Sequence, residues 1–414
     1  MTAARRLAAR WVLPVAAPAI EHGAVLISAE GRILAVGSDS QVPRPPDVRA
    51  EQHADGILIP GLVNTHTHLE LTGLDGPPPE SDFAAWIRRV RTRKAERSAD
   101  QFLEAARTGL ASCYAAGVTT IADTGDSGSV IQALAEAGGS GIAYQEVFGP
   151  HPAQCAESLA GLQARVTELC RFAAGRVGIG VSPHAPYTVS GPLYRAVGRW
   201  ARAERLPMAV HVAESAAEME LLAGSGAFAD AWERRQIPLP SPPGRSPVQW
   251  LGDHEVLGPA TLCIHVVRAG EADMTLLAAE ECPIAHCPRS NAAHRHGDAP
   301  LDALLNAGLR VGLGTDSVMS VGELDLLAEA RAAQALAGLT SERALALCTL
   351  EGAQALGLGA ETGSLVPGKW GDCVVIRAGV EGATPAERVL ASGPRHVRTT
   401  ILGGRVVYRA EGSA

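Results

Sequence analysis

Strand-like apolar runs alternate with helix-like stretches along most of this chain, and this alternation constrains the fold more than any other feature. Eight such runs occur between Gly56 and about Leu358, beginning near Ile57, Val118, Gly141, Val177, Met208, Leu262, Pro283 and Leu309. Amphipathic segments lie between them, such as residues 102–116, 159–174, 193–204 and 216–235. A strand-then-helix unit repeated eight times predicts the α/β class and a closed parallel (β/α)8 TIM barrel.

The two ends of the chain differ from this central region. Short strand signals joined by Gly and Pro turns occur at residues 11–15, 24–28, 33–37, 372–377, 398–402 and 405–409. We expect both ends to build one small composite β-sandwich. The predicted domains are residues 1–58 and 361–414 for the two parts of the sandwich, and residues 59–360 for the barrel that they bracket.

Charge and hydropathy exclude several classes of partner. A net charge of −8 gives no reason to expect nucleic acid or an anionic membrane. No run approaches the roughly 18 apolar residues of a membrane span. Residues 1–18 resemble a signal peptide, but Arg10, Pro14 and Pro18 interrupt the apolar stretch. We therefore expect a mature N-terminal strand and a cytoplasmic protein.

The cysteines agree with that compartment. Eight are scattered along the chain without a CxxC pair, so we expect reduced and mostly buried thiols. Cys282 and Cys287 lie close, but their spacing is not that of a zinc site and favours packing. Homo-oligomers are common among soluble enzymes, and one is possible here.

Metal-ligand residue types lie at the ends of four of the strand-like runs, namely the first, the fifth, the sixth and the last. His66 and His68 follow the first run, His211 ends the fifth, and Asp316 follows the last. In a barrel these strand ends meet at one face. An i, i+2 histidine pair on a strand points both rings to one side. Imidazole and carboxylate ligands predict one divalent metal ion, Zn²⁺ with Fe²⁺ possible, and leave a position open for water.

Three residues are predicted to handle protons. Asp316 contacts the metal and takes a proton from the water, and His265, which ends the sixth run, hydrogen-bonds the nucleophile or is a weak ligand. Glu214, three residues after His211, is predicted to carry protons to the leaving side of the substrate. Attack on an amidine-like carbon needs protons at the ring nitrogen and at the departing ammonia, and one carboxylate can supply both. The alternative role for Glu214 is charge compensation at a helix N-terminus.

The segment 236–246 reads QIPLPSPPGRS and contains too much proline for a helix or a central strand. It is either a lid over the catalytic face or a surface excursion.

Taken together, the motifs resemble the amidohydrolase superfamily over essentially the whole chain. They are PGLVNTHTHLE at 60–70, SPHAPYT at 182–188, HVAES at 211–215, CPRSN at 287–291, GLGTDS at 312–317 and GSLVPGKWGDCVVI at 363–376. The resemblance is to the branch of mononuclear deaminases, and it implies the same metal ligands and proton-handling residues. Binuclear relatives carry a bridging lysine on the fourth strand. Neither Lys94 nor Lys369 lies on such a strand, so a bridged pair of metals is not expected.

The resemblance also suggests substrate-binding residues. His184, within SPHAPYT, matches a histidine that contacts substrate in nucleoside deaminases. The segment after His68, with Phe83-Ala-Ala-Trp86, looks more like aminodeoxyfutalosine deaminases than S-adenosylhomocysteine deaminases. Trp86 is expected to form an apolar wall. Arg289 is a candidate for the carboxylate of the substrate tail, or else it braces a loop. Glu70 and Arg88 are solvated or structural.

These residues predict a small-molecule hydrolase that converts the 6-amino group of an adenine-type nucleoside to an oxo group, with release of ammonia. The expected substrate is aminodeoxyfutalosine, an intermediate of menaquinone biosynthesis. Alternatives are S-adenosylhomocysteine, methylthioadenosine or adenosine, or guanine or cytosine. A triazine chlorohydrolase would not need the proton shuttle of Glu214. A non-catalytic scaffold would be expected to lose metal ligands, which are all present here.

Overall fold

The structure is a computed structural model that describes residues 4–74, 82–377 and 382–411. Its central sheet has eight strands in the order β12-β11-β10-β9-β8-β7-β6-β5, and every pair is parallel. They are β5 (Leu62–Thr67), β6 (Val118–Gly125), β7 (Gly141–Val147), β8 (Val177–Pro183), β9 (Met208–Val212), β10 (Thr261–His265), β11 (Ile284–His286) and β12 (Val311–Leu313). A parallel bridge between Thr67 and Asp316 joins the first strand to the last, so the predicted barrel is confirmed.

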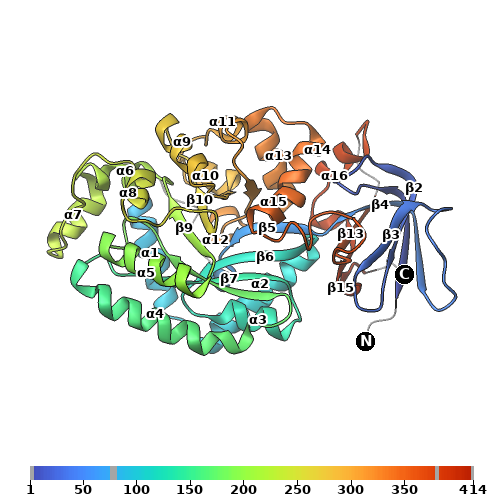
Figure 1. The fold of residues 1–414 in the computed structure, drawn as a ribbon, viewed down its shortest axis with the longest axis horizontal. Helices are drawn as coiled ribbons and strands as arrows, with labels where there is room; N and C mark the ends of the chain where they lie inside the picture. Colours follow the sequence, from blue (N-terminus) through green and yellow to red (C-terminus); the bar gives the residue numbers. More distant parts are fainter. Residues whose placement is uncertain (1–3, 75–81, 378–381, 412–414) are drawn as a thin grey trace.

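Helices surround this barrel, as Figure 1 shows. The longer ones are α1 (Phe83–Ala95), α2 (Ala99–Ala115), α3 (Ser129–Glu136), α4 (Cys155–Leu169), α5 (Gly191–Glu204), α7 (Gly226–Arg234), α9 (Glu271–Ala279) and α13 (Leu326–Ala337). The shorter ones are α6 (Ala216–Leu222), α8 (Pro247–Asp253), α10 (Pro288–Ala293), α11 (Leu301–Asn306), α12 (Val318–Val321), α14 (Ser341–Leu347), α15 (Leu350–Ala355) and α16 (Pro385–Leu390). Single 3₁₀ turns occur at η1 (Leu69–Leu71), η2 (Pro152–Gln154), η3 (Cys170–Phe172) and η4 (Pro394–His396).

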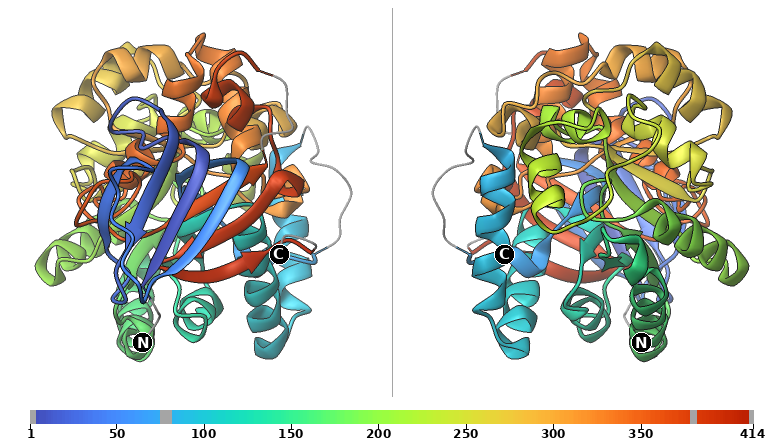
Figure 2. Two further views of the ribbon diagram at one scale, coloured as in Figure 1. Left: turned by 90° about the vertical axis from the view of Figure 1, so that its right-hand side faces the viewer. Right: turned by 90° about the vertical axis from the view of Figure 1, so that its left-hand side faces the viewer.

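Strands from the two ends of the chain hydrogen-bond into one seven-stranded mixed sheet, the composite sheet. Its order is β15-β14-β13-β4-β1-β2-β3. The strands are β1 (Arg5–Val12), β2 (Ile20–Ile27), β3 (Ile33–Ser38), β4 (Arg49–Pro60), β13 (Cys373–Arg377), β14 (Val397–Leu402) and β15 (Arg405–Arg409). Leu7, Val25, Ile27, Leu58 and Val375 belong to a buried cluster of its own. The sheet lies at one end of the barrel, with α6, α7 and α8 at the other (Figures 1 and 2).

Glycines account for two differences from the predicted element boundaries. The apolar run that begins at Ile57 is split, because Ile57–Pro60 ends β4 of the composite sheet and β5 of the barrel begins at Leu62. A Cβ at the intervening Gly61 would lie 2.0 Å from Thr119 Oγ1, so only glycine fits where the chain passes between the sheets. The segment 216–235 is likewise two helices, α6 and α7. Gly224, just after α6, has φ of 81° in the left-handed region that ends a helix, and Gly226, the first residue of α7, has φ of 83°.

Candidate active site

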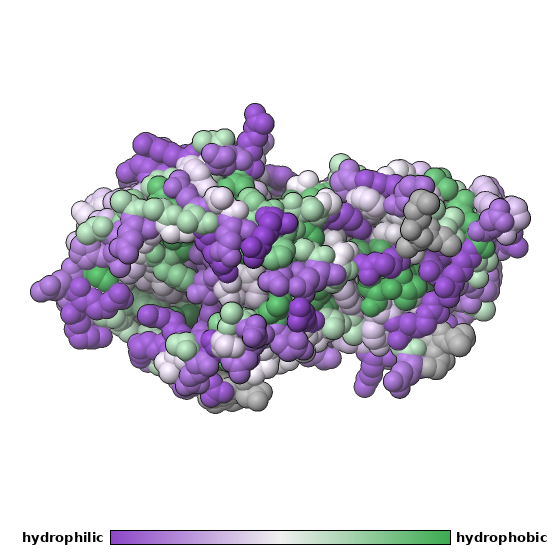
Figure 3. All heavy atoms as spheres, turned by 90° about the horizontal axis from the view of Figure 1, so that it is seen from below, coloured by the Kyte–Doolittle hydropathy of each residue, from purple (hydrophilic) through white to green (hydrophobic). Residues whose placement is uncertain are grey.

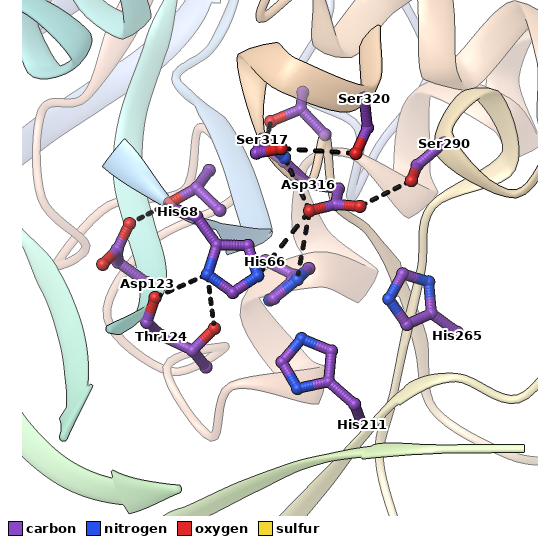
Figure 4. A network of polar contacts seen from close by, with 12 residues as sticks. His66, His68, Asp123, Thr124, His211, His265, Ser290, Asp316, Ser317 and Ser320 are labelled. Atoms are coloured by element: carbon purple, nitrogen blue, oxygen red, sulfur yellow. Dashed lines mark hydrogen bonds and ion pairs between the residues drawn. The ribbon is translucent and has the colours of Figure 1, made fainter. Parts of the chain in front are cut away.

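Five side chains converge where the barrel strands end (Figure 4). His66 lies in β5, His68 follows it, His211 lies in β9, His265 ends β10 and Asp316 follows β12. Asp316 Oδ1 lies 3.8 Å from His66 Nε2 and 3.6 Å from His68 Nε2. The His66 ring centroid lies 4.7 Å from that of His68 and 4.9 Å from that of His211. The structure therefore brings the four predicted ligands together around one point, with His265 beside them.

The backbone at these strand ends is unusual for residues other than glycine. Asp316 has φ of 57°, His265 has φ of 73° and Ala213 has φ of 51°. Left-handed backbone is disfavoured for residues with a Cβ and is concentrated at functional sites. Here it turns the chain sharply as it leaves each strand.

Hydrogen bonds orient two of the imidazoles. His68 Nδ1 lies 2.8 Å from the carbonyl oxygen of Thr124, and His211 Nδ1 lies 3.2 Å from that of His184. A carbonyl only accepts, so each Nδ1 carries the hydrogen and each Nε2 is left with a lone pair. Burial lowers the pKa of His68 and His211, which keeps both rings in the neutral, metal-binding form.

The environment of the His66 ring shows whether a metal ion fits this site. His66 is 1% exposed, and neither of its ring nitrogens has a hydrogen-bond partner among the described residues. Burial also lowers its pKa well below the usual value. A buried polar atom without a partner is costly, and an ion bound at Nε2 would satisfy it. The three inward imidazoles and the Asp316 carboxylate thus fit one divalent metal ion.

Two serines hold the Asp316 carboxylate. Ser290 Oγ donates to Oδ2, and the backbone N–H of Ser317 donates to Oδ1 at 2.6 Å. Outer hydrogen bonds of this kind fix the direction of a metal ligand. Ser290 lies in the CPRSN motif, but the motif alone did not indicate a role for it.

Glu214 follows β9 and lies next to His265. Its carboxylate Oε1 is 3.5 Å from His265 Nε2 and 3.4 Å from His296 Nε2. Burial opposes its ionisation, but His265 and His296 outweigh burial and lower the pKa of Glu214 to about 2. The N-cap of the following helix is Ser215, not Glu214. Glu214 thus lies one residue before the cap, and its carboxylate contacts the two histidines.

A buried carboxylate also anchors the loop that carries His68. Asp123, in β6, accepts hydrogen bonds from Thr67 Oγ1 and from the backbone N–H of Leu69, both at 2.7 Å. Nearby, Lys94 contacts Glu70 at 2.5 Å and Asp126 at 2.6 Å. Glu70 is thus structural, which resolves one alternative left open by the sequence.

A cavity of about 1190 Å³ opens onto the cluster. The proton-handling side chains and His68, His184 and His211 form part of its lining. Trp86 and Phe83 from α1 line it too, and their rings stack with centroids 5.9 Å apart. From below, the molecule is largely hydrophilic, with a hollow on the barrel side where hydrophobic surface is visible (Figure 3).

His184 and Trp86 thus lie where the sequence suggested, but Arg289 does not. Its guanidinium donates to the carbonyls of Val321 at 3.1 Å and Glu323 at 3.2 Å, and it is not part of the cavity lining. This geometry matches the loop-bracing alternative. Residues 236–246 form neither helix nor strand and do not line the cavity, whereas α7 does, through Phe228 and Trp232.

Several cavity or site residues were not found from the sequence. Glu146 is the penultimate residue of β7 and faces His184, with Oε1 4.0 Å from Nε2. It follows the same strand-end rule as the metal ligands, so that rule could have found it. Tyr187 and Phe228 stack at 4.5 Å on the far wall. His294 and His296 lie in a loop, where no periodic pattern marks them.

The comparisons agree with this geometry. Residues 57–407 match the Amidohydrolase family, and the chain belongs to it. It is a hydrolase acting on C–N bonds other than peptide bonds. Within the described residues, no helix combines the length and the apolar character needed to cross a membrane.

The relatives include two kinds of nucleoside deaminase. The chain is 29% identical to a 5-methylthioadenosine/S-adenosylhomocysteine deaminase of Symbiobacterium thermophilum, over 96% of this chain and 92% of that one. It is also 29% identical to an aminodeoxyfutalosine deaminase of Deinococcus radiodurans, over 80% of each. Among solved structures, a zinc-bound adenosine deaminase from Xanthomonas campestris has a TM-score of 0.85 at 25% identity, covering 97% of this chain and 92% of that one.

Proposed function

We propose that this protein is a hydrolytic deaminase of an adenine-type nucleoside. Water replaces the 6-amino group, so the products are the 6-oxo nucleoside and ammonia. The observation that carries this proposal is the buried Glu214 carboxylate, which lines the cavity beside the metal-ligand cluster without belonging to it. Deamination needs such a group, because protons must reach both the ring nitrogen and the departing amine.

In this proposal His66, His68, His211 and Asp316 hold one divalent ion, Zn²⁺ or Fe²⁺. When bound, such an ion lowers the pKa of a coordinated water to about 7 and so supplies a nucleophile at neutral pH.

The side chains around the metal site carry out the proton transfers. Asp316 accepts a proton from the attacking water, and His265 Nε2 hydrogen-bonds that water as it approaches carbon 6. Glu214 accepts the other proton of that water and delivers it to the neighbouring ring nitrogen. It then relays to the amine the proton that Asp316 took up, after which the C–N bond breaks. A low pKa means that Glu214 starts ionised and first accepts the proton that it later donates.

For the substrate we propose aminodeoxyfutalosine, which would place the enzyme in menaquinone biosynthesis. The Phe83 and Trp86 segment that suggested it lies at the cavity wall, where an aromatic tail could pack. Since Arg289 braces a loop, other arginines must bind the benzoate of that tail. Arg88 and Arg91 lie one turn apart on α1, line the cavity and make no ion pair among the described residues. S-adenosylhomocysteine and methylthioadenosine remain the alternatives that the relatives suggest.

The test is ammonia release by zinc-loaded protein from aminodeoxyfutalosine, S-adenosylhomocysteine, methylthioadenosine, adenosine, guanine and cytosine. We expect aminodeoxyfutalosine to have the highest kcat/KM. Arg88→Ala together with Arg91→Ala should raise KM for this substrate but leave KM for methylthioadenosine, which has no carboxylate, within about twofold. Faster release from another adenine nucleoside would retain the mechanism and change the substrate. No release from any of the six would refute the deaminase proposal.

A further inference from the structure

Glu214 is contacted by two histidines, of which only His265 was predicted to belong to the site. His265 Nε2 and His296 Nε2 both approach the same carboxylate oxygen, at 3.5 Å and 3.4 Å. All three side chains are buried, with His296 only 4% exposed. His296 follows α10, and its backbone N–H donates to the carbonyl of Asn291 at 2.9 Å, which fixes the loop. The ring of Phe83 packs edge-on against it at 4.7 Å.

The two imidazoles differ in where they carry their hydrogen. His265 Nδ1 lies 3.0 Å from Asn291 Oδ1, and Asn291 Nδ2 points to His286 Nδ1 at 3.5 Å. An amide oxygen only accepts, so the hydrogen of neutral His265 is on Nδ1. Its Nε2 then presents a lone pair, which gives the Glu214 carboxylate no hydrogen bond but can accept one from a nucleophile.

No comparable hydrogen bond determines which ring nitrogen of His296 carries the hydrogen. Its Nε2 is buried and has no hydrogen-bond partner among the described residues, although Glu214 Oε1 lies 3.4 Å away. A buried ring nitrogen without a partner is costly, so a nearby acceptor is expected to take its hydrogen. The Glu214 carboxylate lies close enough for a small rotation of either side chain to let it accept an Nε2 hydrogen.

We infer that His296 is a positioning residue for Glu214. Its Nε2–H donates to Oε1, which fixes the carboxylate and leaves the second oxygen free to exchange protons with the substrate. His265 Nε2 remains available to the attacking water. This inference rests on the proposed deaminase function for its catalytic consequence, but the hydrogen bond itself does not depend on any substrate.

Two substitutions separate a hydrogen-bonding role from a packing role. The amide nitrogen of His296→Gln can reach the place of Nε2, whereas His296→Ala has no donor. In zinc-loaded protein we expect His296→Ala to lower kcat about 10- to 100-fold, with KM and zinc content nearly unchanged. His296→Gln should recover most of that loss. His22→Gln, at an exposed histidine of the composite sheet, is the matched control and should leave kcat unchanged.

Equal loss of kcat in the Ala and Gln variants would overturn the inference, as would a loss that follows zinc content. Nitrogen NMR of ¹⁵N-histidine-labelled, zinc-loaded protein shows which ring nitrogen of His296 is protonated, and it needs no substrate. We expect His296 to be protonated at Nε2 and its signal to shift in Glu214→Ala. An Nδ1-protonated His296, or a signal that Glu214→Ala leaves in place, would refute the hydrogen bond. If the wild-type protein released no ammonia while the NMR result held, only the deaminase proposal would fail.

Discussion

At the scale of single residues, the proposed catalysis depends on separating the groups that bind metal from the group that moves protons. Glu214 lies three residues after His211, yet its carboxylate contacts His265 and His296. Removing its charge should therefore spare metal binding and impair turnover.

We predict that Glu214→Gln lowers kcat by about 10²- to 10⁴-fold, because the amide cannot transfer protons. Metal content measured by atomic emission should match that of the wild-type protein. Turnover at the wild-type rate would exclude Glu214 as the shuttle.

Substitution of Ser290 tests the hydrogen bond that orients Asp316 and leaves Asp316 itself unchanged. Ser290→Ala removes the donor to Asp316 Oδ2 and should weaken metal affinity or activity by about 10- to 100-fold. Chelator competition measures the affinity directly. Ser112→Ala, at an exposed serine of α2, controls for the substitution itself. Identical affinities in the two variants would show that Ser290 does not orient Asp316.

The sequence predicted the convergence of His66, His68, His211 and Asp316 because strand ends in a barrel share one face. It could not place Arg289, since the direction of a long side chain depends on its packing, here against the carbonyls of Val321 and Glu323. His296 was missed for a similar reason, because a loop has no repeating pattern to show which side chains turn inward.

At the scale of elements, one cation joins three segments near the site. Lys94 of α1 bridges Glu70 of η1 and Asp126 of the β6–α3 connection. Glu70 is 1% exposed, so removal of Lys94 would leave a buried charge without its partner. The sequence showed each element but not this link, because ion pairs between distant segments follow from packing.

We predict that Lys94→Met lowers the free energy of unfolding by about 3–5 kcal/mol. Adding Glu70→Gln should recover part of this loss, since the uncompensated charge is then gone. Urea unfolding of both variants measures the difference. A double variant no more stable than Lys94→Met would show that the loss comes from packing and not from charge.

The Glu70 carboxylate also predicts how the stability of the protein changes with pH. Burial raises the pKa of Glu70, but Lys94 outweighs burial and lowers it from 4.5 to about 2. A group with a depressed native pKa stabilises the fold above its unfolded pKa and loses that contribution as the pH falls through the native value. Wild-type stability should therefore fall between about pH 4.5 and 2, and Glu70→Gln should show a shallower fall. Parallel acid-unfolding curves would contradict this assignment.

At the scale of the whole molecule, the composite sheet and the barrel are joined by a buried ion pair. Arg176, before β8, donates to Asp372 at 2.9 Å, and Asp372 also accepts from Thr362 Oγ1 and the backbone N–H of Gly403. The sequence predicted that both ends of the chain share a module. It could not give the strand order, in which β4 lies between β1 and β13, because the pairing of β4 with β13 joins segments hundreds of residues apart.

Burial should decide how much this pair contributes to stability, and the chain offers a matched comparison. Asp372 and Asp55 each pair with an arginine through two oxygens, but their side chains are 1% and 64% exposed. Breaking a buried pair leaves an unsatisfied charge and costs about 3–5 kcal/mol, whereas an exposed pair contributes about 1 kcal/mol or less.

Asp372→Asn should therefore lower Tm by several degrees more than Asp55→Asn in thermal unfolding of the zinc-loaded protein. Because Asp372 is not part of the catalytic cavity, kcat below the unfolding range should not change in either variant. Equal shifts in Tm would mean that Thr362 and Gly403 stabilise the amide as well as the carboxylate, and that charge contributes little to holding the two modules together.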